Sequence, residues 1–147
     1  MAYTAEIKSA KGLTIEGLTS LVILAVLLFL FSTSLWISIP QTSRLQISDI
    51  IIVILVALFI RKSEKLVSPF SAVVSLGLHV DVKKVSVLLQ GFLRFIYLVV
   101  AYFSLKRTSL NVLTLALDSA NASVVYDAVF TVLILLNFYD TVRKVVK

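Results

Sequence analysis

The chain has 147 residues, contains no cysteine and carries a formal net charge of +6. Hydrophobic residues make up 59% of it and charged residues 15%, whereas soluble domains average roughly 45–50% apolar and about 25% charged residues. This composition excludes an ordinary soluble domain and indicates a single membrane-embedded domain over residues 1–147. The lack of cysteine excludes disulfides, thiolate metal sites, iron–sulfur clusters and cysteine nucleophiles.

The first apolar segment is Leu18–Ile39, which lies inside a stretch without charge from Gly17 to Ser43. About 20 helical residues cross a bilayer core, so this segment is long enough to span one. Trp36 suits the membrane interface at its far end, and Pro40 cannot continue the helix. The segment is longer than the roughly 7–15 residues of a signal-peptide core, so we expect a retained first span.

The second segment has Ile50–Ile60 as its uninterrupted apolar part, followed at once by Arg61. Its length predicts a short span or a deeply buried helix. Further on, Ser68 and Pro69 occupy the order that a helix N-cap and first helical position favour. We therefore expect a separate helix to begin at Pro69 and to run to Val80, lying at the membrane interface because it is too short to cross.

The second half of the chain contains two more apolar segments, Val85–Leu105 and a stretch from about Ser109 to Tyr139. No glycine or proline follows Gly91, so the polar tetrad Lys106–Ser109 is the predicted turn between them. The expected fold is all-α, a hydrophobic four-helix bundle that allows a fifth, short interfacial helix at 69–80.

Four spans place both chain termini on the same side of the membrane. Basic residues are then divided unevenly, ten against three, which is the positive-inside pattern and predicts cytoplasmic termini. The three on the opposite side are Arg44, Lys106 and Arg107. The ten on the side of the termini are Lys8, Lys11, Arg61, Lys62, Lys65, Lys83, Lys84, Arg143, Lys144 and Lys147.

Arg94 lies near the middle of the third segment, where an unpaired charge costs about 2.5–3.5 kcal/mol on insertion scales. A hairpin about Lys106–Ser109 brings Arg94 level with Asp118 and Asn121, so Asp118 is its first predicted partner and Asp127 the second. One interpretation is an ion or substrate relay. The other, which we favour because no chain of acidic residues accompanies Arg94, is a structural buried pair.

The remaining polar residues predict packing rather than chemistry. The stripe that contains Asn111, Thr114, Asp118 and Asn121 has helical spacing and is typical of a helix–helix contact. His79 is the only histidine, and no oxyanion-forming glycine turn accompanies it, so catalysis there is not expected. We expect no enzyme, no metal site and no cofactor.

The four apolar helices of this cysteine-free chain resemble the major capsid proteins of large tailed spindle-shaped archaeal viruses. The resemblance covers the whole chain as architecture, on Leu18–Ile39, Ile50–Ile60, Val85–Leu105 and Ala122–Tyr139. It implies a hydrophobic coat protein that enters the host membrane before assembly, forms homo-oligomers of many copies and encloses a double-stranded DNA genome in the virion.

If such a particle buds outward, the cytoplasmic face becomes its interior. The basic residues of that face would then neutralise DNA phosphates without reading sequence, or only orient the helices against lipid headgroups. The genome-facing candidates are Arg61, Lys62, Lys65, Lys83, Lys84, Arg143, Lys144 and Lys147.

A second resemblance points to another class of protein. The half that contains Gly91–Arg94 and Lys106–Ser109 is similar to small four-span bacterial and archaeal proteins of the phosphate-starvation-inducible type. It implies a small integral membrane protein, either an accessory subunit or a minor transporter.

Overall fold

The computed structural model describes residues 2–33 and 47–146 as an all-α protein, which confirms the expected fold class. Its four helices are α1 (Ala2–Ser32), α2 (Ile47–Leu78), α3 (Val82–Leu113) and α4 (Ser119–Val146). They contain 28 to 32 residues each, or about 42–48 Å at 1.5 Å per residue. Trp36, Pro40, Arg44 and Lys147 lie outside the described residues.

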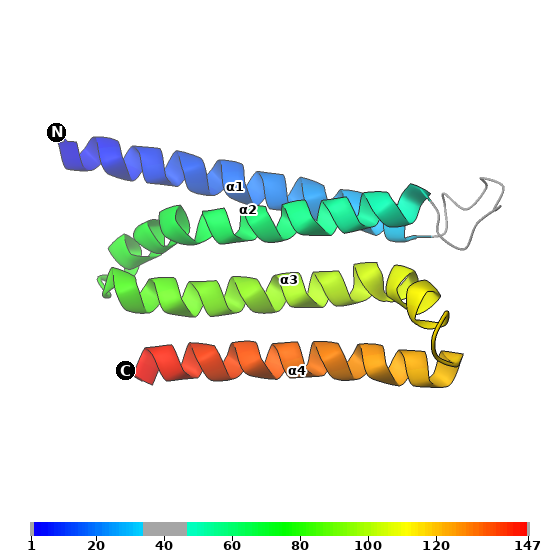
Figure 1. Ribbon diagram of the computed structural model, residues 1–147. Helices are drawn as coiled ribbons and strands as arrows, with labels where there is room; N and C mark the ends of the chain where they lie inside the picture. Colours follow the sequence, from blue (N-terminus) through cyan, green and yellow to red (C-terminus); the bar gives the residue numbers. More distant parts are fainter. Residues whose placement is uncertain (1, 34–46, 147) are drawn as a thin grey trace.

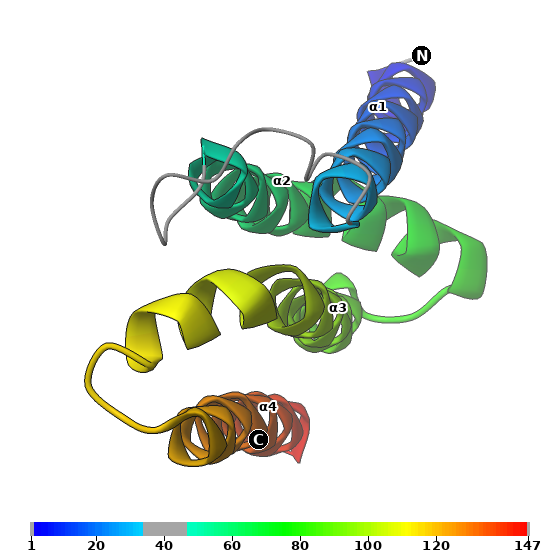
Figure 2. The ribbon, with the colours of Figure 1, turned by 90° about the vertical axis from the view of Figure 1, so that its right-hand side faces the viewer.

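The helices lie side by side in chain order, each antiparallel to the one before (Figure 1). The view along the helices shows α1 and α4 at opposite edges of the row, with α2 and α3 between them (Figure 2). Both described ends of the chain therefore lie at one end of the row, together with the α2–α3 connection (Figure 1). The arrangement is an open bundle, because its two edge helices leave their outer faces uncovered.

The buried residues of α1 and α2 recur at heptad-like spacings, as in a coiled coil. Thr14, Leu21 and Leu28 of α1 are buried and lie seven residues apart. Between Asp49 and Leu66, the buried residues of α2 alternate at three and four residues, the spacing that keeps one stripe on the packed side of a helix. That stripe consists of Asp49, Ile52, Val56, Phe59, Ser63 and Leu66.

The prediction of a separate helix beginning at Pro69 is wrong, because α2 continues through Pro69 to Leu78. Figure 1 shows that this last part of α2 bends away from the rest, as expected of a helix with an internal proline. The helix stops at His79, whose φ of 55° is left-handed. The backbone N–H of Val80 then donates to the Ser75 carbonyl, which is the closing bond of a Schellman cap.

The predicted turn at Lys106–Ser109 is also wrong. Helix α3 runs to Leu113, and the turn falls at 114–118. Asp118 begins α4, because its carboxylate accepts a hydrogen bond from the backbone N–H of Asn121 at 3.2 Å, the geometry of an N-cap. The polar stripe predicted on one helix is thus divided between α3, the turn and α4, and the register of α3 against α4 shifts accordingly.

Candidate membrane belt and basic end

Polar as well as apolar side chains are buried between the helices of this row, while apolar ones cover its outside. Seven of the described polar residues are buried beside eleven hydrophobic ones, whereas thirty-four large hydrophobic residues are exposed. Phe29, Phe103 and Phe138 are 68–70% exposed, while Ser63 is 1% and Asp49 2% exposed. Small and polar contacts between helices with an apolar exterior are typical of proteins packed in lipid.

The uncharged parts of the four helices form one continuous zone, here called the apolar belt. It consists of 17–32 in α1, 50–60 in α2, 95–105 in α3 and 128–139 in α4, and no Asp, Glu, Lys or Arg occurs in any of them. The shortest of these segments have eleven residues, or about 17 Å of helix. A layer of polar contacts borders the belt on each side.

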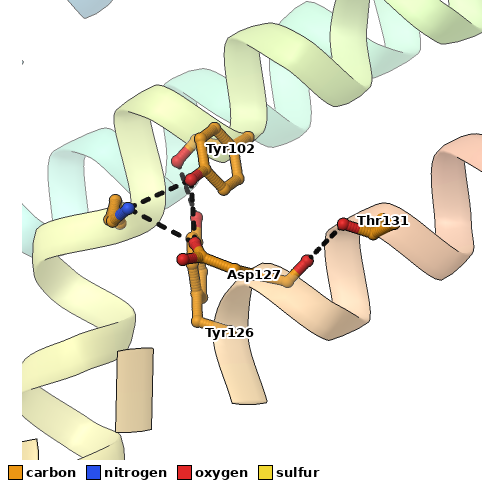
Figure 3. Close-up of polar contacts among 5 residues, drawn as sticks. Tyr102, Tyr126, Asp127 and Thr131 are labelled. Carbon is orange, nitrogen blue, oxygen red and sulfur yellow. Dashed lines mark hydrogen bonds and ion pairs between the residues drawn. The ribbon is translucent and has the colours of Figure 1, made fainter. Parts of the chain in front are cut away.

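The layer farther from the chain termini joins α3 to α4 through Tyr102 and Asp127 (Figure 3). The Tyr102 hydroxyl donates to Asp127 Oδ1 at 2.8 Å. Lys106 Nζ donates to that hydroxyl at 3.0 Å and to the carboxylate at 3.3 Å. Tyr126 stacks on Tyr102 and donates to its backbone carbonyl at 2.7 Å. Lys106, which was expected in a turn, therefore binds Asp127, which was expected to be a partner of Arg94.

The same layer continues to α2 through a buried contact. Thr108 of α3 donates its hydroxyl to Asp49 Oδ1 at 2.8 Å, and both residues are buried. The hydroxyl thus satisfies a carboxylate that lies at the boundary of the apolar belt. Thr108 belongs to the tetrad predicted as a turn, and in the structure it lies inside α3 and faces α2 through this contact.

The layer nearer the termini contains Arg94, but its partner differs from the one expected. The guanidinium lies 3.9 Å from Asp140 of α4, and Asp118 caps the other end of that helix. The reason is the later turn, which moves the residues of α4 opposite Arg94 towards its C-terminus. Asp140 also accepts from Lys144 at 2.7 Å, so it serves two cations.

Asn121 and Asp127, the other residues expected near Arg94, lie in the first half of α4. Asn121 is exposed. The sequence carried no signal for Asp140 as the partner, because its position depends on where α3 ends. The N-cap role of Asp118 did have a signal, since Asp is among the residues that favour the N-cap position of a helix.

Close to Arg94, α3 and α4 approach each other at a glycine. A Cβ added to Gly91 would collide with the side chain of Thr141. The Gly91 carbonyl accepts a hydrogen bond from Asn137 Nδ2 at 3.0 Å, and Thr141 donates to the Asn137 carbonyl. Glycine is therefore needed here for helix contact rather than for backbone freedom.

The charge of the molecule lies mainly beyond this second layer, in a region here called the basic end. It consists of 2–16, 61–94 and 140–146, which lie at the end of the row where the chain begins and ends (Figure 1). Ten of the twelve described Lys and Arg residues are found there with five acidic residues, whereas the opposite end, 47–49 and 106–127, has two basic and three acidic residues. The sequence-predicted side of the termini is thus strongly basic.

The candidate genome-facing residues all belong to this basic end where the structure describes them, and all are exposed. They come from three helices and are therefore not one linear motif. The exposed set is Arg61, Lys62, Lys65, Lys83, Lys84, Arg143 and Lys144.

Among residues 2–33 and 47–146, three helices are by length and composition able to cross a membrane: Lys8–Ser32 in α1, Val82–Leu113 in α3 and Ser119–Val146 in α4. Helix α2 carries Arg61, Lys62, Glu64 and Lys65 near its middle. The second apolar segment, unlike the other three, therefore does not lie in a candidate membrane span.

Within residues 2–33 and 47–146, no group of three or more His, Asp or Glu side chains is placed to hold a metal ion. Comparison of the chain with protein-family models, with curated proteins and with solved structures finds no match.

Proposed function

We propose that this chain is a structural, non-enzymatic protein that places its apolar belt in a lipid layer and associates with copies of itself. Its basic end then lies against the phosphate backbone of double-stranded DNA, as in the coat of a virus particle. The observation that carries the proposal is the inverted exterior: apolar side chains cover the belt, and positive charge gathers beyond one edge of it. The comparisons identify no family, and the resemblance of the four apolar helices to spindle-shaped virus coat proteins supports the proposal.

The amount of exposed surface supports association with copies. Thirty-four large hydrophobic residues of the described part of the chain are exposed, and contiguous apolar surface of this kind marks membrane or protein contacts. The outer faces of α1 and α4 contribute side chains such as Phe29 and Phe138. A second copy placed at either edge would extend the row and cover one of these faces.

The one-sided charge supports the DNA contact. If copies associate with parallel orientation, their basic ends form a continuous positive surface on one side of the lipid layer. The basic residues occur on three helices without a base-reading element, so contacts would neutralise phosphates and be independent of sequence. The principal candidates for phosphate contacts are Lys83 and Lys84 at the start of α3 and Arg143 and Lys144 near the end of α4.

Self-association is tested on the full chain purified in mild detergent and then returned to lipid. Sedimentation of the detergent-solubilised protein gives its mass, and electron microscopy after detergent removal shows its assemblies. The proposal predicts large oligomers that become tubes, spindles or ordered sheets. A single-chain species in several detergents that remains dispersed in lipid would contradict it.

The alternative is a small integral membrane protein acting as an accessory subunit or minor transporter. The cluster of Tyr102, Lys106 and Asp127 favours it, because charged groups beside an apolar membrane region often relay ions or protons. An ion-flux assay on sealed vesicles separates the two functions. Flux that is lost in Asp127→Asn supports the transporter, and its absence in vesicles that contain the folded chain supports the structural role.

A further inference from the structure

A groove between α1 and α2 crosses the boundary between the apolar belt and the basic end. It has a volume of about 450 Å³, and Thr19 and Ser20 of α1 are among its lining residues. Ile23, Leu24 and Leu58 line it on the belt side, and Glu16 and Lys62 lie at its other end. The two helices lie side by side along this region (Figure 1). The groove thus joins a hydrocarbon-like surface to a charged one.

A second hollow, of about 230 Å³, adjoins the charged end of this groove. It shares Glu16 and Lys62 with the groove and adds Lys65. Both lysines are exposed, and neither belongs to an ion pair within the described part of the chain. With Glu16 counted, the mouth of the groove carries a formal charge of one positive unit, which complements a ligand with one negative charge.

We infer that this groove binds a membrane phospholipid with a singly charged anionic headgroup. Its phosphate lies on Lys62 and Lys65, and one acyl chain lies along Ile23, Leu24 and Leu58. Basic pockets between helices at the membrane surface are a known mode of anionic lipid recognition. The Glu16 carboxylate repels a headgroup that carries a second negative charge, and it accepts a hydrogen bond from a headgroup hydroxyl. The inference rests on the proposed membrane function and assigns these two lysines to lipid.

Depth along the helices favours lipid over DNA at this position. Lys62 is two residues beyond the belt segment of α2, or about 3 Å, which is the level of lipid headgroups. Lys84 is eleven residues from the belt segment of α3, or about 17 Å. A polymer outside the lipid layer reaches Lys84 first, whereas a phosphate covalently attached to acyl chains reaches Lys62.

The test uses the full chain in vesicles of phosphatidylcholine with or without one fifth phosphatidylglycerol. After mild detergent extraction, native mass spectrometry measures the ratio of the two lipids retained. The variant Lys62→Gln/Lys65→Gln is compared with Lys8→Gln/Lys11→Gln, which removes two exposed lysines at the same spacing outside both hollows.

The wild type and the Lys8/Lys11 control should retain phosphatidylglycerol in preference to phosphatidylcholine. A basic residue near an anionic lipid surface changes affinity about fivefold, so the Lys62/Lys65 variant should lose up to about 30-fold of this preference. Leu58→Trp should also reduce retention, with every charge unchanged, because it fills the groove. No preference in the wild type, or equal losses in the two double variants, would overturn the inference.

Flotation with pure phosphatidylcholine vesicles separates this result from the proposed function. Every variant should float, because none of them introduces a charge into the apolar belt. If the chain floats but Lys62 and Lys65 behave like Lys8 and Lys11, the lipid site alone fails. If the wild type does not float, the membrane function fails and the lipid site fails with it.

Discussion

Replacement of Gly91 by alanine tests the register of α3 against α4. A Cβ at this position would lie within contact of Thr141 side-chain atoms, closer than real Cβ atoms approach. Such overpacking costs about 1–3 kcal/mol, and separating the helices weakens the hydrogen bond from Asn137 to the Gly91 carbonyl, worth about 0.5–1.5 kcal/mol. Alanine regains about 1 kcal/mol of helix propensity. We therefore expect Gly91→Ala to lower the free energy of unfolding by about 2 kcal/mol.

Unfolding in mixed micelles, followed by circular dichroism, measures this change. Gly12→Ala is the matched control, because a Cβ there meets no atom within 4 Å, and it should stabilise by up to about 1 kcal/mol. Thr141→Ala in the Gly91→Ala background should recover stability, with a coupling of about 1–2 kcal/mol. A stabilising Gly91→Ala, or no coupling to Thr141, would refute the α3–α4 register and with it the pairing of Arg94 and Asp140.

Two further predictions concern the far polar layer and the basic end. Thr108→Val should lower the free energy of unfolding by about 1–3 kcal/mol, because the buried Asp49 carboxylate loses a hydrogen bond. The control Thr131→Val, at an exposed position, should change the free energy of unfolding by less than about 0.5 kcal/mol in the same measurement. Equal effects of the two substitutions would contradict the buried contact. Lys83→Gln/Lys84→Gln should reduce the slope of log affinity for duplex DNA against log salt by about 1.8, at 0.9 per phosphate contact. An unchanged slope in fluorescence anisotropy would remove these lysines from the proposed DNA interface.

The fold class could be predicted because it depends on composition and on long uncharged runs. Segments as long and as apolar as Leu18–Ile39 and Val85–Leu105 predict helices without any knowledge of their neighbours. The separation of basic residues from the apolar segments also follows from sequence alone. These features need no knowledge of which helix faces touch.

The turn at 114–118 was missed because tertiary contacts override the local pattern. Lys106 and Thr108 look like turn residues until their partners Asp127 and Asp49 are known. Arg94 was assigned to Asp118 as a direct consequence, since an error in the turn moves every residue of the following helix. The need of Arg94 for an acidic partner followed from the cost of a buried charge. Which acidic residue is the partner depends on the register of α3 against α4.

The buried stripes of α1 and α2 could not be predicted from the sequence either. Their buried positions include Thr14, Asp49 and Ser63, while Val22 and Ile54 are apolar and exposed. A search for an apolar stripe on a polar helix therefore fails, because apolar residues occupy the exposed side of these helices as well as the buried side. In a helix that is apolar on all sides, the polar and small residues indicate the packed face.

Depth measurement on single spin labels tests the central claim, that the apolar belt lies in lipid and the basic end in water. The chain has no cysteine, so one cysteine at a time can replace Phe103 or Phe138 in the belt, and Lys84 or Lys144 in the basic end. In reconstituted vesicles, the two belt labels should collide mainly with oxygen and the two basic-end labels mainly with a water-soluble nickel chelate. If the chelate reaches the belt labels as readily as the basic-end labels, the belt does not lie in lipid and the account is contradicted.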